Sequence, residues 1–432
     1  MMPASRAVGV NVGLAVTILL AAMMLGGSTS NPVYEMSISI VALFCLVVSV
    51  WWGRQQSAAW PAVTIIAVIL ALFIVQLLPL PDVIWSALAQ GRFAHSLPAA
   101  ANVDRMWKTL SIAPDATLYS MTACVPALVM LWLTSKTSQT EKMLLANVFI
   151  GASVGSALIG IAQAAKAWSP VLYEFRHQDV AIGLFASRNY FATSMLMAAA
   201  ILFALRQSWA KRLGQGLAEL LFHSALLLFL AAVVGSASRA GVVLFLFVGT
   251  AGYALSLKPG SRIRFMAAAL IVGVLVWALW QYLPQTGVVK TTAARFELDD
   301  DARLEIWRNS LLAAKSYWPW GAGIGTFRLA YEQTEPLISV TPSYINAAHN
   351  EYLQLLIEAG AFGLLVALGV SIMIVMFGWR HRHEPLVLFA VLGLLAVGMH
   401  SIVDYPFRPT SLNVAIATFC AFVVAPFASR KR

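Results

Sequence analysis

Long apolar segments alternate with short polar ones along almost the whole chain. Most of these segments have close to the roughly 20 apolar residues that a helix needs to cross a bilayer. The pattern therefore predicts about 12 transmembrane helices, at residues 8–26, 36–53, 61–78, 116–134, 142–165, 187–206, 217–236, 240–257, 265–283, 350–379, 385–403 and 410–427.

The composition agrees with this pattern. Hydrophobic residues make up 60% of the 432 residues and charged residues 11%, against about 45–50% and about 25% in ordinary globular proteins. A soluble enzyme, a secreted disulfide scaffold and a disordered regulator are excluded, and the predicted fold class is an all-α polytopic membrane protein. Cys45, Cys124 and Cys420 lie inside apolar segments, where we expect them to pack as small hydrophobic residues.

The distribution of charge predicts the orientation in the membrane. With both termini in the cytoplasm, the cytoplasmic segments carry 15 of the 29 Lys and Arg residues but only three of the 19 acids. This skew is what the positive-inside rule expects. The net charge of +10 therefore needs no nucleic-acid partner, and no aromatic and Arg pattern typical of nucleic-acid binding is present.

Two predicted outer loops are long, and the second divides the chain into residues 1–283, 284–349 and 350–432. The first loop, 79–115, ends in the amphipathic residues Met106, Trp107 and Leu110, which we expect at the membrane interface. The second is too long to be a simple connector.

Short helices are predicted inside the large loop. Asp299–Asp301 precede an amphipathic pattern of Leu304, Trp307, Leu311 and Ala314, and acids favour a helix N-terminus. The glycines of Gly321-Ala-Gly-Ile-Gly325 then predict a tight turn, because the strand and helix context of a nucleotide-binding fingerprint is missing.

Three arginines lie at predicted outer helix ends, where a positive charge near the membrane is costly. They are Arg188, Arg239 and Arg303. Grouped guanidinium groups bind phosphate oxygens in bidentate pairs, which makes a phosphate or pyrophosphate site the functional interpretation. The alternative is that each arginine reaches water or pairs with an acid such as Asp179 or Asp300.

His349 lies just before the helix predicted at 350–379. With Asn346 as N-cap, His349 falls in the first helical turn, where the helix dipole favours a neutral imidazole. A neutral imidazole accepts a proton from a sugar hydroxyl; the alternative is an interfacial histidine satisfied by a backbone carbonyl. We expect Gly360 and Gly363 to allow close helix–helix packing.

Two further clusters of polar residues are less specific. His381–Glu384 resembles a metal site but lies in a basic predicted cytoplasmic loop, so no metal is predicted there. His400, Asp404 and Arg408 lie at one predicted outer helix end, where they either line a site or close a salt bridge.

Over roughly residues 180–410 the sequence resembles the O-antigen ligase and polymerase superfamily of bacterial envelope glycosyltransferases. His349-Asn350, nine residues and Gly360-Ala361-Phe362-Gly363 fit the family's histidine pattern. The run from Arg303 through Trp307 to Gly323 resembles the start of the family's large periplasmic loop. Residues 183–192 and 238–241 are similar to its upstream helix junctions.

The resemblance implies a GT-C-like architecture in the bacterial inner membrane with the active site facing the periplasm. It implies an inverting transfer without metal or cofactor, from a glycan on undecaprenyl pyrophosphate to a hydroxyl on lipid A–core or on another lipid-linked glycan.

The matching positions give the residues their expected roles. His349 is the expected general base or acceptor-orienting residue, and Arg239 and Arg303 hold the pyrophosphate. Arg188 is a third candidate, although many relatives have another residue beside the adjacent Asn. The supporting candidates are Asn189, Asn350, Glu351 and Asp404.

Several alternatives stay open at this point. A polysaccharide polymerase uses the same donor with a different acceptor. A protein O-oligosaccharyltransferase is less favoured, because such relatives often carry a further C-terminal domain. A transporter or flippase of an anionic glycolipid also needs outward arginines, but it predicts polar residues at the midplane of several helices. A retaining route requires a carboxylate nucleophile, for which Glu351 and Asp404 are available.

Overall fold

The fold is described from a computed structural model, which covers residues 4–28, 32–52, 57–88, 107–166, 173, 180–258, 260–265, 303–339 and 344–426. Eight helices within these residues are long and apolar enough to cross a membrane. They are α2 (Pro32–Trp52), α3 (Trp60–Leu77), α5 (Pro114–Ser135), α6 (Gln139–Ala164), α7 (Arg188–Leu213), α8 (Gln215–Gly235), α9 (Arg239–Ser256) and α13 (Glu351–Arg380).

Three further apolar helices complete the bundle: α1 (Ala4–Leu25), whose apolar part is Gly9–Leu25, α14 (Pro385–His400) and α15 (Thr410–Val424). The eleven helices coincide with eleven of the twelve predicted segments. The twelfth, 265–283, lies outside the described residues except for its first position. The all-α polytopic fold is therefore confirmed, while the number of spans stays a prediction.

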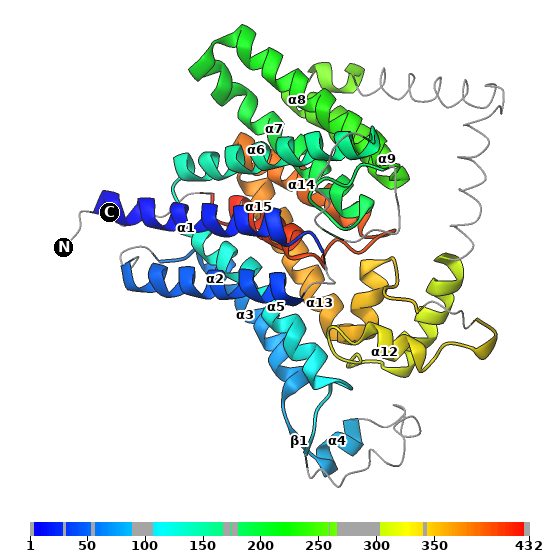
Figure 1. Ribbon diagram of the computed structural model, residues 1–432. Coiled ribbons are helices and arrows are strands. Elements are labelled where there is room, and N and C mark those ends of the chain that lie inside the picture. Colours follow the sequence, from blue (N-terminus) through cyan, green and yellow to red (C-terminus); the bar gives the residue numbers. More distant parts are fainter. Residues whose placement is uncertain are drawn as a thin grey trace, which may run out of the picture.

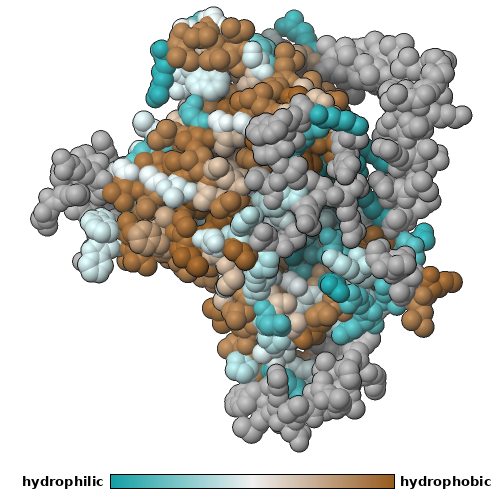
Figure 2. Space-filling model, viewed as in Figure 1, coloured by the Kyte–Doolittle hydropathy of each residue, from teal (hydrophilic) through white to brown (hydrophobic). Residues whose placement is uncertain are grey.

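Helix α7 forms the centre of the bundle (Figure 1). It packs against α8, α9 and α14, and 83% of its apolar window is buried. The outer helices α2 and α13 have side chains such as Ile40, Phe44 and Leu365 exposed on the outside of the bundle. Hydrophobic residues accordingly cover most of the bundle surface seen in Figure 2, as expected for a surface that faces lipid.

Polar contacts join the predicted outer helix ends at one side of the bundle. The Ser411 amide donates to the carbonyl of Gly26 (3.0 Å), and the Ala186 amide donates to that of Gly27 (2.9 Å). At the other side, Arg206 of α7 pairs with Glu219 of α8 (2.6 Å). This grouping agrees with the predicted threading, while the sidedness in the membrane remains a prediction.

Helix α13 is broken at Gly360, whose backbone angles are φ 61° and ψ −151°. The break frees carbonyls that the turn of residues 319–323 takes up: the Ala322 amide donates to Ile357 (2.7 Å) and the Gly323 amide to Glu358 (2.8 Å). A Cβ at position 360 would collide with the carbonyl oxygen of Pro319. The expectation that Gly360 serves helix–helix packing is thus wrong, because its close neighbour is this turn.

The predicted tight turn is confirmed, since Gly321, Gly323 and Gly325 all have positive φ. A Cβ at Gly363 would meet the side chains of Ala359 and Leu355, which belong to the same helix. Close helix–helix packing at Gly363 stays a prediction.

The large loop contains a helix over 303–316, then α12 (Phe327–Glu332) and the 3₁₀ helix η2 (Leu337–Ser339). Its short helices were predicted. The predicted buried face of the first is confirmed only in part, since Trp307 and Ala314 pack in or against a small hydrophobic core. Leu304 and Leu311 are exposed, whereas Ile306 and Ala313 pack with Tyr317 in the same core. The helix buries this face because α12 and the start of α13 supply the apolar partners. Asp299–Asp301 lie outside the described residues.

The first long loop contains α4 (Asp82–Leu88) and two very short antiparallel strands, β1 (Leu80–Pro81) and β2 (Trp107–Lys108). Trp107 lies in β2, and Leu110 is buried against the rest of the protein. Met106, the remaining residue of the predicted interfacial stretch, lies outside the described residues.

Candidate functional site

The three arginines singled out from the sequence line one small pocket of about 30 Å³. Arg188 is the first residue of α7, Arg239 is the first residue of α9, and Arg303 is the first described residue of the loop helix. The pocket is lined by Arg188, Asn189, Ala237, Ser238, Arg239, Ala240, Arg303, His400 and Val403.

Two serines determine where α7 and α9 begin. Ser187 caps α7 by accepting a hydrogen bond from the Asn189 amide (3.3 Å), and Ser238 caps α9 by accepting one from the Gly241 amide (3.3 Å). The Ser238 hydroxyl also donates to the side-chain oxygen of Asn189 (2.9 Å). The two helix starts are therefore fixed side by side, and each has its arginine at the first position.

The electrostatics of this pocket favour an anion. Helix N-termini carry partial positive charge and free amides, and two of them meet here together with three guanidinium groups. Guanidinium groups bind phosphate through paired hydrogen bonds. The pocket is therefore suited to hold one phosphate group, or to stabilise negative charge that develops on a departing phosphate.

Asp404 lies behind the pocket, in the turn between α14 and α15. It is 1% exposed, and its carboxylate accepts a hydrogen bond from the side-chain amide of Asn189. Burial raises the pKa of Asp404 to about 7, although the Asn189 hydrogen bond and the charge of Arg303 act in the opposite direction. Asp404 therefore connects the α14–α15 turn to the start of α7.

His349 does not line the arginine pocket, but two aromatic contacts link it to α7. Its ring packs edge-on against Tyr405, with 5.0 Å between the centroids, and Tyr405 packs in the same way on Tyr190 (5.5 Å). Tyr190 directly follows Asn189 in α7. The three rings thus form a short path between His349 and the pocket.

The expected helical position of His349 is wrong. Asn350 is the N-cap of α13, because its side chain accepts the Leu353 amide (3.0 Å). Asn346 therefore does not cap this helix, and His349 precedes it with φ 50°, a left-handed conformation. Because His349 precedes the first helical turn, the helix dipole does not support the prediction of a neutral imidazole in the way expected from the sequence.

The loop helix that carries Arg303 is tied to the segment of His349. The indole nitrogen of Trp307 donates to the carbonyl of Ala348 (3.0 Å), the residue before His349. This contact was not predicted, although the sequence had placed Trp307 on the buried side of the helix.

The segment 400–408 has both of the roles left open by the sequence. His400 and Val403 line the pocket. Arg408 instead forms a buried ion-pair cluster, with Glu351 at 3.0 Å and Glu358 at 3.0 Å. Glu351, a supporting candidate, is thus engaged by Arg408 and by the Phe407 amide.

The sequence left open whether His400 lines a site or takes part in a salt bridge, and its place in the pocket shows the first. His400 ends the apolar helix α14 and is 1% exposed, and its Nδ1 lies 2.8 Å from the Thr193 hydroxyl of α7. The available signal was a histidine at the outer end of an otherwise apolar helix. Within the described part of the chain, no three His, Cys, Asp or Glu side chains are grouped so that they could hold a metal ion.

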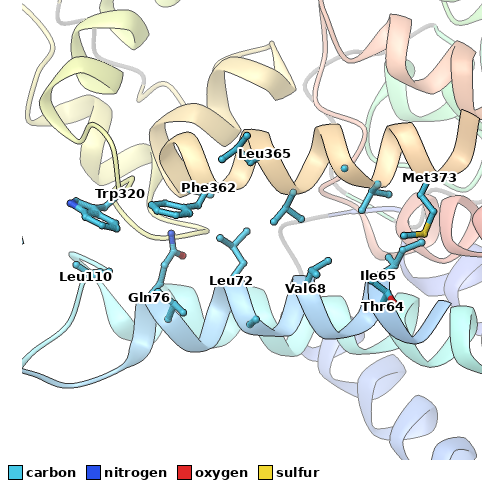
Figure 3. A pocket seen from close by; sticks show the side chains of 16 residues that line it. Thr64, Ile65, Val68, Leu72, Gln76, Leu110, Trp320, Phe362, Leu365 and Met373 are labelled. Atoms are coloured by element: carbon cyan, nitrogen blue, oxygen red, sulfur yellow. The ribbon is translucent and has the colours of Figure 1, made fainter. Parts of the chain in front are cut away.

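A second cavity, of about 580 Å³, is an apolar groove between α3 and α13 (Figure 3). Val68 and Leu72 line one wall and Leu365 and Met373 the other. Gln76 closes the end near the loops, where its amide donates to the Glu358 carbonyl (2.8 Å) and Trp320 stacks on Phe362 (5.1 Å). The groove therefore lies between two membrane-spanning helices and ends beside the turn that enters the break in α13.

Residues 224–368 match the family model described as O-antigen ligase. The match begins in α8, includes Arg239, Arg303 and His349, and ends in α13. A search of curated proteins found no match. The resemblance to the O-antigen ligase and polymerase superfamily is thereby confirmed.

Proposed function

From the premise that this chain carries an O-antigen ligase domain at residues 224–368, we propose that it is a membrane glycosyltransferase of the O-antigen ligase type. It moves a glycan from undecaprenyl pyrophosphate to a hydroxyl of lipid A–core. We place it in the bacterial inner membrane, with both termini in the cytoplasm and its active site facing the periplasm. The observation that carries the proposal is the pocket shared by Arg188, Arg239 and Arg303.

In the proposed reaction, the acceptor oxygen attacks the anomeric carbon while the bond from that carbon to the pyrophosphate oxygen breaks. The negative charge that collects on the leaving pyrophosphate is stabilised by the arginines of the pocket. His349 takes the proton of the attacking hydroxyl, a role that contributes roughly 10²- to 10⁴-fold in rate. The sugar is transferred with inversion, because attack and departure occur on opposite faces.

Two features support these assignments. The hydrogen bond from Trp307 to Ala348 keeps the Arg303 helix beside the His349 segment. The pairing of Glu351 with Arg408 occupies the carboxylate that a retaining route would need as a nucleophile, which favours the inverting route. Asp404 is engaged by Asn189 and fits a supporting role.

The apolar groove supports a lipid-linked substrate. Its walls are aliphatic side chains of two membrane-spanning helices, so a hydrocarbon chain enters it from the bilayer without burying polar groups. We assign the groove to the polyprenyl chain of the donor. A soluble sugar nucleotide has no hydrocarbon chain that could occupy this groove.

The deciding experiment uses the purified protein with a lipid-linked oligosaccharide, with and without lipid A–core, in the presence of EDTA. We expect transfer to lipid A–core. Chain growth on the donor alone would instead identify a polysaccharide polymerase, and loss of activity in EDTA would contradict the metal-independent mechanism.

Two variants separate proton transfer by His349 from pyrophosphate binding by Arg239. His349→Ala should abolish turnover while donor binding persists. Arg239→Lys should weaken the binding of inorganic pyrophosphate by roughly tenfold or more, because a lysine cannot form the paired hydrogen bonds. Arg206→Lys, at the opposite end of α7, is the control and should leave that binding unchanged.

A further inference from the structure

His400 is the side chain of the arginine pocket that the proposed reaction does not use. It lines the pocket and is almost completely buried. One ring nitrogen, Nδ1, faces the Thr193 hydroxyl at 2.8 Å, whereas Nε2 has no hydrogen-bond partner among the described residues. A buried polar atom without a partner is costly, so a ligand is the natural partner for Nε2.

The hydrogen bonds of Thr193 determine which group Nε2 offers. The Thr193 hydroxyl donates its single proton to the carbonyl of Asn189 (2.9 Å), so it accepts a hydrogen bond from His400 Nδ1–H. In the neutral ring this leaves a lone pair on Nε2.

The other lining side chains do not offer such an acceptor. The arginines are donors only. The side-chain oxygens of Asn189 and Ser238 are already engaged, since Asn189 accepts from the Ser238 hydroxyl and Ser238 accepts from the Gly241 amide. Ala237, Ala240 and Val403 contribute only apolar atoms. The pocket therefore combines several donors, which suit a phosphate, with one acceptor, which suits an O–H or N–H group and repels a phosphate oxygen.

We propose that His400 recognises the sugar of a glycosyl phosphate, by accepting a hydrogen bond from the hydroxyl or amide N–H on the carbon next to the anomeric carbon. This inference rests on the proposed function, since it assumes that the arginines hold the phosphate. That position follows from the chemistry of a glycosyl phosphate, in which the group on the carbon next to the anomeric carbon is the hydrogen-bond donor nearest to the phosphate.

The test compares three soluble probes: glucose 1-phosphate, 2-deoxyglucose 1-phosphate and inorganic phosphate. Their binding to the full-length protein in nanodiscs is measured by calorimetric competition against inorganic pyrophosphate. We expect the wild-type protein to prefer glucose 1-phosphate over its 2-deoxy analogue by about tenfold, the usual effect of one buried hydrogen bond.

Three variants separate recognition from folding. His400→Phe should abolish the preference for glucose 1-phosphate over its 2-deoxy analogue, because it removes the accepting nitrogen. His400→Gln should restore part of the preference, because its amide oxygen can accept in place of Nε2. Thr193→Val should reduce the preference for glucose 1-phosphate, although Thr193 does not line the pocket. It removes the hydroxyl that fixes the tautomer of the His400 ring.

The possible results are distinct. Equal wild-type affinity for the two sugar phosphates would overturn the role of His400 while the phosphate pocket stands. An unchanged preference in His400→Phe would overturn it as well. Failure of all three probes and of pyrophosphate to bind the wild-type protein would remove the arginine pocket itself, and with it both the proposed function and this inference.

Discussion

The hydroxyl of Ser238, the N-cap of α9, donates a hydrogen bond to the side-chain oxygen of Asn189, the second residue of α7, across 2.9 Å. Asn189 uses its amide group at the same time to bind Asp404. One asparagine thus holds together the two helix starts that carry Arg188 and Arg239, and it also anchors the α14–α15 turn.

Replacing Asn189 should therefore affect both stability and binding. Asn189→Ala leaves buried groups without partners, so we expect the free energy of unfolding to fall by about 1–3 kcal/mol. Pyrophosphate affinity should fall with it, since the arginines lose their relative placement. Asn147→Ala is a matched control at the opposite end of the bundle, where Asn147 accepts from Trp209 (2.9 Å). Asn147→Ala should lower the melting temperature without changing the pyrophosphate affinity. A similar loss of pyrophosphate binding in this control would contradict the role of Asn189 in positioning the arginines.

The pH dependence of stability should carry a contribution from Asp404. Burial raises its pKa in the folded protein to about 7, above its ordinary value of 3.8. The folded state thus favours the protonated form, and the stabilisation present below pH 3.8 is lost as the pH rises through about 7.

We expect the melting temperature of the wild type to fall between pH 5 and pH 8 more steeply than that of Asp404→Asn, which lacks this titration. The exposed Asp82 provides the control, and Asp82→Asn should follow the wild-type curve. Parallel curves for wild type and Asp404→Asn would argue against a raised pKa.

The break in α13 should depend on glycine at position 360. In Gly360→Ala, the alanine must adopt a backbone conformation that is essentially confined to glycine, at a cost of about 1–3 kcal/mol. Its methyl group also meets the Pro319 carbonyl. We expect a clearly lowered melting temperature and faster proteolysis of the loop. Gly369→Ala, on the same helix with open space around its Cβ, should be neutral or slightly stabilising.

Filling the groove should impair turnover of substrates with long lipid chains. Val68→Phe introduces a ring between α3 and α13, which we expect to raise the KM for a long polyprenyl donor by roughly tenfold. A tenfold change corresponds to the loss of about 55 Å² of buried apolar contact between the lipid chain and the groove. A donor with a short prenyl chain should be turned over as in wild type. Val243→Phe, exposed on α9, is the control. Equal effects on both donors would exclude a chain in this groove.

The sequence predicted the helices well because apolar length is a direct consequence of bilayer thickness. It also singled out Arg188, Arg239 and Arg303, because isolated charges at membrane helix ends are conspicuous. Their convergence on one pocket depends on how α7 and α9 pack, which hydrophobic periodicity does not encode.

Other features were missed for physical reasons. The position of His349 depended on which of two asparagines caps the helix, and capping strength at Asn346 and Asn350 is similar in isolation. The role of Gly360 was misjudged because a glycine in an apolar helix has the same pattern whether it meets a helix or a turn. The sequence could not decide whether His400 lines a site or pairs with an acid, because its place in the pocket depends on arginines from distant segments.

The break at Gly360 also reconciles two buried acids with a helix that crosses the bilayer. The twenty residues from 361 to 380 rise about 30 Å, which is the thickness of the hydrocarbon core. We therefore expect the preceding two and a half turns, in which Arg408 pairs with Glu351 and Glu358, to lie outside the hydrocarbon core. The single helix α13 thus consists of a span of ordinary length, residues 361–380, and a shorter segment before Gly360. A substrate that approaches from the lipid would meet this shorter segment next to the break.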